Sequence, residues 1–165
     1  MASGPDRADV PISLASDRVN RIRHRFVRQD LRVTDVTPTA DDYAAVLAAF
    51  EAMEKAGWRP TTLNSQMEAW AELVSEVETG YGMTIDDYTN DLSVRKWLEQ
   101  VRALVTEPIA DSIAERLAPL DQRFLDATVV PSHHMPGAGE GWWYRLPRVL
   151  VDELREDAPR MGLVD

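Results

Sequence analysis

Two histidines and a carboxylate in one loop are the residues of this chain best suited to bind a metal ion. His133 and His134 are adjacent, and Glu140 follows them in a stretch rich in proline and glycine. Imidazole and carboxylate ligands suit Zn²⁺, and two histidines with one carboxylate also suit Fe²⁺. Adjacent histidines are poorly arranged for one ion, however, and no HExxH or Glu-x-x-His pair completes the set. A metal-dependent enzyme using residues 133–140 is therefore kept only as an alternative, and we expect no cofactor.

Other catalytic signatures are missing from the 165 residues. The sequence has no GxSxG, no GxxxxGK[ST] and no GxGxxG after a strand-like segment, so an activated serine and a phosphate loop are both unsupported. It has no cysteine, which excludes disulfides, a cysteine nucleophile and zinc sites built on thiolates. The spacing of the carboxylates does not pair them as a general acid and base would require. We expect a protein that is not an enzyme.

Arginines are concentrated near the N-terminus, where residues 18–32 contain six arginines and one aspartate. Such a basic segment can bind nucleic acid phosphates, which makes a nucleic-acid-associated regulator an alternative function. The residues that would carry it are Arg21, Arg23, Arg25 and Arg28. The same segment can instead fold against the acidic remainder of the chain, and we favour this interpretation because it needs no outside ligand. The periodicity of the segment fits a helix and a strand equally well.

The remainder of the chain is strongly acidic. The whole sequence has 28 Asp and Glu against 18 Lys and Arg, a net charge of -10. Residues 37–165 alone hold 23 acidic and 11 basic residues, so their net charge is -12. An acidic surface repels nucleic acids and anionic lipids but complements a basic protein. We therefore expect a basic protein partner, consider nucleic acid an unfavourable one, and expect no membrane association because no apolar run approaches about 18 residues.

Acidic residues and tryptophans are the candidates for the surface that binds this partner. The set consists of Glu72, Glu76, Asp86, Asp87, Trp142 and Trp143. The carboxylates would meet basic groups, and the tryptophans would serve as apolar anchors, since Trp is frequent among residues that dominate binding energy. Asp86 and Asp87 have another interpretation as first-turn residues that stabilise a helix start. Trp142, Trp143 and Tyr144 can also be interpreted as residues that fix a loop to the bundle, with two of the three side chains facing inward.

Helical periodicity dominates the sequence from residue 39 onward. Thr39 with Asp42, and Thr84 with Asp87, have the spacing of helix N-terminal caps. A seam of apolar residues spaced three and four apart comprises Leu63, Met67, Trp70, Val74, Val77 and Tyr81. We expect a helix break near Asn90, an ion pair between Asp91 and Arg95, and a kink or restart at Pro119. A loop over residues 128–141 then precedes a short helix that opens at Pro147.

These segments predict an all-α fold, a single-domain bundle of about five helices with a Pro/Gly-rich loop before the C-terminal helix. Residues 1–16 are predicted to be a disordered leader, residues 17–36 a basic segment and residues 37–165 the acidic bundle. Sixteen of the 18 basic residues are arginines, which is typical of a GC-rich bacterial coding sequence.

The most consistent functional prediction is a non-enzymatic, cytoplasmic protein-binding module. Small size, an acidic helical body and the lack of a catalytic set suit an immunity or antitoxin-type inhibitor of a basic partner such as a toxin. Carboxylates would stand in for the phosphates that the basic cleft of a toxin normally binds. The sequence does not predict the oligomeric state.

Overall fold

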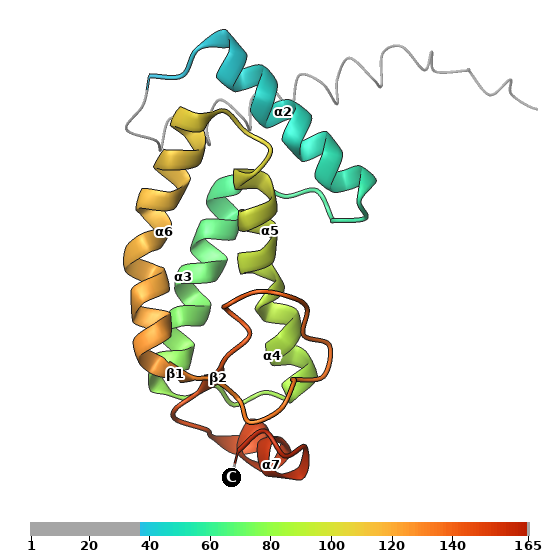
Figure 1. Cartoon of the computed structure of the whole chain (residues 1–165), viewed down its shortest axis with the longest axis vertical. Helices are drawn as coiled ribbons and strands as arrows, with labels where there is room; N and C mark the ends of the chain where they lie inside the picture. Colours follow the sequence, from blue (N-terminus) through green and yellow to red (C-terminus); the bar gives the residue numbers. More distant parts are fainter. Residues whose placement is uncertain (1–36, 165) are drawn as a thin grey trace, which may run out of the picture.

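The computed structural model describes residues 37–164 of the chain, and most of this part is helical (Figure 1). The elements in chain order are α2 (Ala40–Lys55), α3 (Leu63–Thr79), α4 (Ile85–Asp91), α5 (Ser93–Arg102), α6 (Glu107–Ala127), β1 (Thr128–Val129), β2 (Leu146–Pro147) and α7 (Asp152–Arg160). The predicted leader and the basic segment, with Arg21, Arg23, Arg25 and Arg28, lie outside the described residues. Within residues 37–164, every helix is too short or too polar to cross a membrane.

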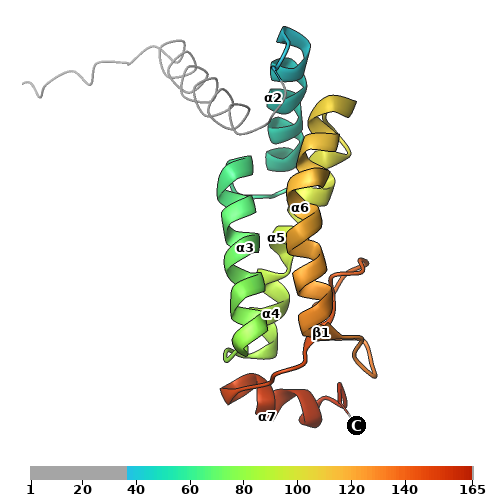
Figure 2. The same cartoon turned by 90° about the vertical axis from the view of Figure 1, so that its left-hand side faces the viewer.

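Helices α3, α5 and α6 run lengthwise beside one another, with α2 across one end of the bundle and α7 across the other (Figures 1 and 2). The apolar seam predicted over residues 63–81 faces the core of this arrangement, and its last member, Tyr81, lies just beyond the end of α3. All six of its members are buried, with Trp70, Val74 and Val77 completely inaccessible. The mainly helical fold that the sequence predicts is thus observed, and the spacing of α3 accounts for the side that it buries.

Helix α2 begins with the predicted cap. Thr39 Oγ1 accepts a hydrogen bond from the backbone N–H of Asp42, and the Asp42 carboxylate accepts in return from the backbone N–H of Thr39 at 2.8 Å. Asp42 also accepts a hydrogen bond from Thr106 Oγ1, the residue immediately before α6. The hydrogen bond from Thr106, supported by those from Thr39, holds the pKa of Asp42 below its ordinary value of 3.8. One buried carboxylate therefore fixes the start of α2 and ties it to the start of α6.

Replacing Asp42 with alanine should lower the free energy of unfolding at pH 7 by about 1–2 kcal/mol, because the cap and the tie to Thr106 are both lost. Since the pKa of Asp42 is lower in the folded protein than in the unfolded chain, its contribution is complete above pH 3.8 and disappears as the pH falls through the folded-state pKa. Urea unfolding at pH 7 and pH 3 measures both effects. Asp41→Ala is the matched control, since Asp41 is exposed on the same turn, and an equal loss in the two variants would contradict this role.

The break expected near Asn90 lies between α4 and α5, which are separated by Leu92 alone. Thr84 caps α4 as predicted, with its hydroxyl accepting from the backbone N–H of Asp87. The predicted pairing of Asp91 with Arg95 is wrong. Asp91 instead accepts a hydrogen bond of 2.7 Å from the Tyr81 hydroxyl, and Arg95 turns toward α6.

The sequence predicts a kink or a restart at Pro119, and the structure shows no restart, because α6 continues through this residue. A proline inside a helix removes one backbone hydrogen bond, the one that would reach the carbonyl of Glu115. Pro119 and Glu115 are both exposed, so water can satisfy this carbonyl and the helix is not forced to end.

A short antiparallel pair of strands corrects two further predictions about the C-terminal region. Thr128 pairs with Pro147, and Val129 pairs with Leu146. The predicted loop therefore starts with a strand, and Pro147 lies in a strand rather than opening a helix. Helix α7 begins only at Asp152. This pairing returns the segment that contains the two tryptophans to the end of α6.

Candidate functional site

Glu72 and Glu76 lie on the exposed side of α3, beside the junction of α4 and α5. Together with Asp91 they line a groove of about 180 Å³, here called the acidic groove. Its other lining residues are apolar: Ala69, Leu73 and Val94. The sequence thus predicted two of the three carboxylates, and Asp91 was missed because its spacing favours a partner on its own helix. The acidic groove combines negative charge with an apolar floor.

Electrostatic repulsion within the acidic groove is not relieved by basic side chains of the described part. Within residues 37–164, the carboxylates of Glu72 and Glu76 form neither a hydrogen bond nor an ion pair with those residues. Burial raises the pKa of Tyr81 far above its ordinary value, and the negative charges of Asp91, Asp87 and Glu76 add to this shift. Tyr81 therefore stays protonated and donates its hydrogen bond to Asp91.

The other two predicted acids, Asp86 and Asp87, are exposed in the first turn of α4. Asp87 accepts a hydrogen bond of 2.7 Å from the Thr84 hydroxyl, so it contributes to the helix cap. Its negative charge also contributes to the raised pKa of Tyr81, but Asp87 does not line the acidic groove. Asp86 is not among the lining residues of that groove.

Trp142 and Trp143 lie at a different groove, between α5 and α6. This groove has a volume of about 370 Å³ and is called the Trp–Arg cleft here. Its lining residues are Arg95, Glu99, Arg102, Ala114, Leu117, Ala118, Asp121, Trp142 and Trp143. The structure therefore places the predicted anchors, Trp142 and Trp143, in a different groove from the acids Glu72 and Glu76. Helix α5 borders both grooves, because Val94 lines the acidic groove and Arg95 lines the Trp–Arg cleft.

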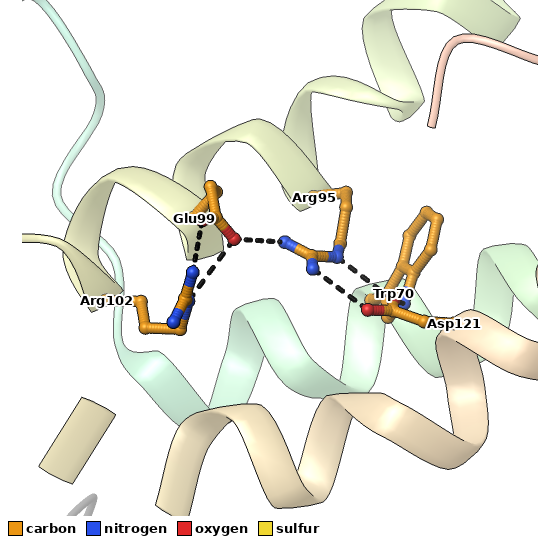
Figure 3. Close-up of polar contacts among 5 residues, drawn as sticks. All are labelled: Trp70, Arg95, Glu99, Arg102 and Asp121. Atoms are coloured by element: carbon orange, nitrogen blue, oxygen red, sulfur yellow. Dashed lines mark hydrogen bonds and ion pairs between the residues drawn. The ribbon is translucent and has the colours of Figure 1, made fainter. Parts of the chain in front are cut away.

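A ladder of charged side chains crosses the Trp–Arg cleft (Figure 3). Arg95 Nε and Nη2 donate hydrogen bonds of 3.0 and 2.9 Å to the two oxygens of Asp121. The remaining nitrogen, Nη1, donates to Glu99 at 3.2 Å. Trp70 Nε1 adds a hydrogen bond of 3.0 Å to Asp121 from α3. Because Arg95 is only 5% exposed, these contacts compensate a charge that is nearly removed from water.

Arg102 extends the ladder toward solvent. Its Nε and Nη2 donate to the two oxygens of Glu99, and this pair is about one third exposed. The hydrogen bonds from Arg102 lower the pKa of Glu99, with Arg95 adding to the effect and burial opposing it. The same contact raises the pKa of Arg102. Glu99 is thus ionised and bridges two guanidinium groups.

Aromatic rings close one end of the Trp–Arg cleft. The Arg95 guanidinium lies 5.3 Å from the ring centroid of Trp142 and 5.4 Å from that of Trp143, within the range of cation–π attraction. Trp142 also packs edge-on against Phe124, and Phe124 contacts Trp70 in the core. Trp143 is 6% exposed whereas Trp142 is 40% exposed. Trp143 thus fixes the segment to the bundle, and Trp142 leaves part of its ring accessible.

The two histidines are not brought together by the loop that carries them. His133 Nδ1 lies 2.8 Å from the carbonyl oxygen of Gly162, and His134 Nε2 lies 3.0 Å from that of Ala138. Glu140 is exposed. Across the part of the chain that the structure describes, no group of three or more His, Cys, Asp and Glu residues is placed to hold a metal ion. The His133 contact joins the loop to the segment after α7, whereas the His134 contact lies within the loop.

The Arg95–Asp121 pair is the part of the cleft that sequence reasoning missed. The two residues are 26 positions apart, and no local pattern links them. The available signal was indirect, because an arginine on the same face of a helix as Leu98 and Val101 would need a buried partner. Comparisons with protein-family models, with curated proteins and with solved structures gave no match to this chain.

Proposed function

We propose that the protein is a non-enzymatic, cytoplasmic binding module that captures a basic protein partner through the acidic groove. The type of activity that fits best is inhibition of the partner, as by an immunity protein or an antitoxin. The observation that carries this proposal is the pair of uncompensated carboxylates, Glu72 and Glu76, beside an apolar floor in a strongly acidic chain.

The shape and charge of the acidic groove suit a lysine or arginine side chain. Such a side chain has an aliphatic stem that prefers apolar surface and a charged head that prefers carboxylates. Leu73 and Val94 would contact the stem, while Glu72 and Glu76 would bind the head. A basic protein offers several such side chains at once, and its encounter with an acidic body is accelerated by electrostatic attraction.

Some carboxylates of the bundle have basic partners within the chain. Glu99 pairs with Arg95 and Arg102, and Glu78 pairs with Arg123. Their charge is compensated before any partner arrives. Glu72 and Glu76, like Glu115 and other exposed carboxylates, form no ion pair with a described cation, but they also line a groove with an apolar floor, which supports their role in binding a cation from outside.

Neutralising the acidic groove should weaken binding of the partner at least about tenfold, or about 1.4 kcal/mol. The variant is Glu72→Gln with Glu76→Gln, and the control is Asp111→Asn with Glu115→Gln. Both pairs are exposed and four residues apart on a helix, so both changes remove two charges. Affinity capture from the native host at low salt identifies the partner, and titration of the purified partner measures the dissociation constant of each variant.

Two results would contradict this function. Capture of no basic protein, even at low ionic strength, would remove the partner that the acidic groove requires. Equal weakening in the two double variants would show that net charge matters and the groove does not.

A further inference from the structure

Hydrogen-bond donors outnumber acceptors in the Trp–Arg cleft. Each guanidinium carries five N–H donors. Arg95 uses three of them on Asp121 and Glu99, and Arg102 uses two on Glu99. Every oxygen of the two carboxylates already accepts at least one of these hydrogen bonds. The two guanidinium groups therefore keep N–H groups that donate to neither carboxylate, while every oxygen of Asp121 and Glu99 already accepts a hydrogen bond.

Trp143 adds a donor that has no partner among residues 37–164. Its Nε1–H is buried and unpaired among the described residues, although the residue is 94% removed from solvent, given its 6% exposure. An unpaired buried donor costs free energy, and such groups in native proteins call for a specific explanation. Because Nε1 has almost no accessible surface, a ligand oxygen would reach it only after Trp143 moved.

The unused donors of the cleft, rather than its net charge, favour an anion over a cation, because Arg95 and Arg102 are balanced by Glu99 and Asp121 and the charge of Asp111 also acts on Arg102. Arg95 already lies against the rings of both Trp142 and Trp143, so a second cation at these rings would be repelled by the first. The unused donors of Arg102 are the accessible ones, since its side chain is 38% exposed whereas that of Arg95 is only 6% exposed. An oxyanion would bind at Arg102, where two N–H groups of a guanidinium can meet two oxygens.

The remaining walls of the cleft suit a flat apolar body. Leu117 and the small side chains of Ala114 and Ala118 form the α6 side, and the exposed part of Trp142 closes one end. Its volume of about 370 Å³ lies within the range of roughly 300–1,000 Å³ that small-molecule sites occupy. An aromatic ring against the Trp142 indole would gain area burial and ring–ring contact together.

We propose that the Trp–Arg cleft binds a small aromatic carboxylate, whose oxygens accept hydrogen bonds from Arg102 and whose ring packs against Trp142. The site does not involve the acidic groove, so it goes beyond the protein-binding function and stands or falls independently of it. When the ligand binds, Arg102 donates hydrogen bonds to the ligand carboxylate as well as to Glu99. Exposed ion pairs contribute little to stability, so weakening the contact between Arg102 and Glu99 costs little free energy.

Titration of the full-length protein with 2-naphthoate tests the site. Calorimetry should show saturable binding at millimolar probe concentrations. Among the indole N–H signals in ¹H–¹⁵N spectra, that of Trp143 should shift. Arg102→Gln and Trp142→Ala should each weaken binding at least about tenfold. Arg160→Gln, which alters another exposed arginine paired with a glutamate, should leave it unchanged. Glu72→Gln with Glu76→Gln should also leave it unchanged, which separates this site from the acidic groove.

Four outcomes would overturn the proposal. The first is the absence of saturable binding of 2-naphthoate. The second is equal affinity for the neutral amide 2-naphthamide, and the third is full affinity of the Arg102→Gln variant for 2-naphthoate. Acetate and inorganic phosphate test the aromatic part, and equal affinity for either is the fourth outcome, because it would remove the role of Trp142. Since Arg102 is half-exposed, its variant is expected to fold, and circular dichroism verifies this for both variants.

Discussion

Replacement of Asp121 by alanine is expected to lower the free energy of unfolding by roughly 3–5 kcal/mol, the cost of leaving a buried charge without its partner. Asp121 binds Arg95 through two hydrogen bonds and also accepts one from Trp70. Alanine removes all three acceptor contacts at once. Arg95 keeps only Glu99, which it shares with Arg102. Urea denaturation at pH 7, followed by tryptophan fluorescence and circular dichroism, measures the loss.

The matched comparison is a double variant in which Arg95→Met and Asp121→Leu remove both charges. Apolar replacement of a buried pair is often neutral or stabilising, so this variant should be clearly more stable than Asp121→Ala. Glu78→Ala breaks the exposed pair with Arg123 and should have little effect. A small effect of Asp121→Ala, similar to that of Glu78→Ala, would show that the Arg95 charge is not isolated from water in the folded protein.

The same interaction explains why the tryptophan segment binds to this part of the bundle. A guanidinium held in place by Asp121 and Glu99 presents a fixed cation to two indole rings. Cation–π attraction is stronger where the groups are desolvated, and Arg95 is nearly inaccessible. The ladder thus positions Trp142 and Trp143, and these residues complete the cleft.

Local patterns in the sequence predicted the starts of α2 and α4 correctly, but they placed the start of the last helix at Pro147 instead of Asp152. The α3 seam is buried as its spacing requires, and the hydroxyls of Thr39 and Thr84 cap α2 and α4. These features depend on contacts within four residues, which a sequence shows directly. The break between α4 and α5 was also predicted, although no side chain caps α5.

Contacts between distant segments could not be predicted in the same way. Asp91 precedes Arg95 by one turn, which indicated an ion pair, yet Arg95 pairs with Asp121 on another helix. The choice depends on which side of α5 faces α6, and this is decided by tertiary packing. The strands are only two residues long, too short to produce alternation, so their pairing was missed.

The candidate sites were predicted where local helix geometry places their residues and were missed where tertiary packing does. Glu72 and Glu76 lie one turn apart on α3, so their common location followed from helix geometry. The distance between them and the tryptophans did not, because it depends on the path of the chain over residues 128–147. That path places Trp142 against α5 and α6 rather than beside the acids.

Gly141 controls this path, and its replacement by alanine is expected to destabilise the protein by roughly 2–5 kcal/mol, the sum of backbone strain and overpacking. Gly141 has a φ of 153°, and a Cβ atom there would lie 2.5 Å from Cε2 and 2.7 Å from Cη2 of Trp143. The indole is buried, so the new methyl group can be accommodated only if the indole or the backbone shifts. Alanine should therefore displace Trp143 and disrupt the Trp–Arg cleft.

Gly57→Ala separates the two causes of this loss. Gly57 also has a positive φ, 93°, but a Cβ atom there would meet no other atom within 4 Å. It should lose about 1–2 kcal/mol through backbone strain alone and retain 2-naphthoate binding. Gly141→Ala should lose more stability than Gly57→Ala in urea denaturation and should also lose the probe. If the two variants lose equal stability and both bind 2-naphthoate like the unmodified protein, the indole tolerates the new methyl group, and the contact between Gly141 and Trp143 does not hold the cleft in shape.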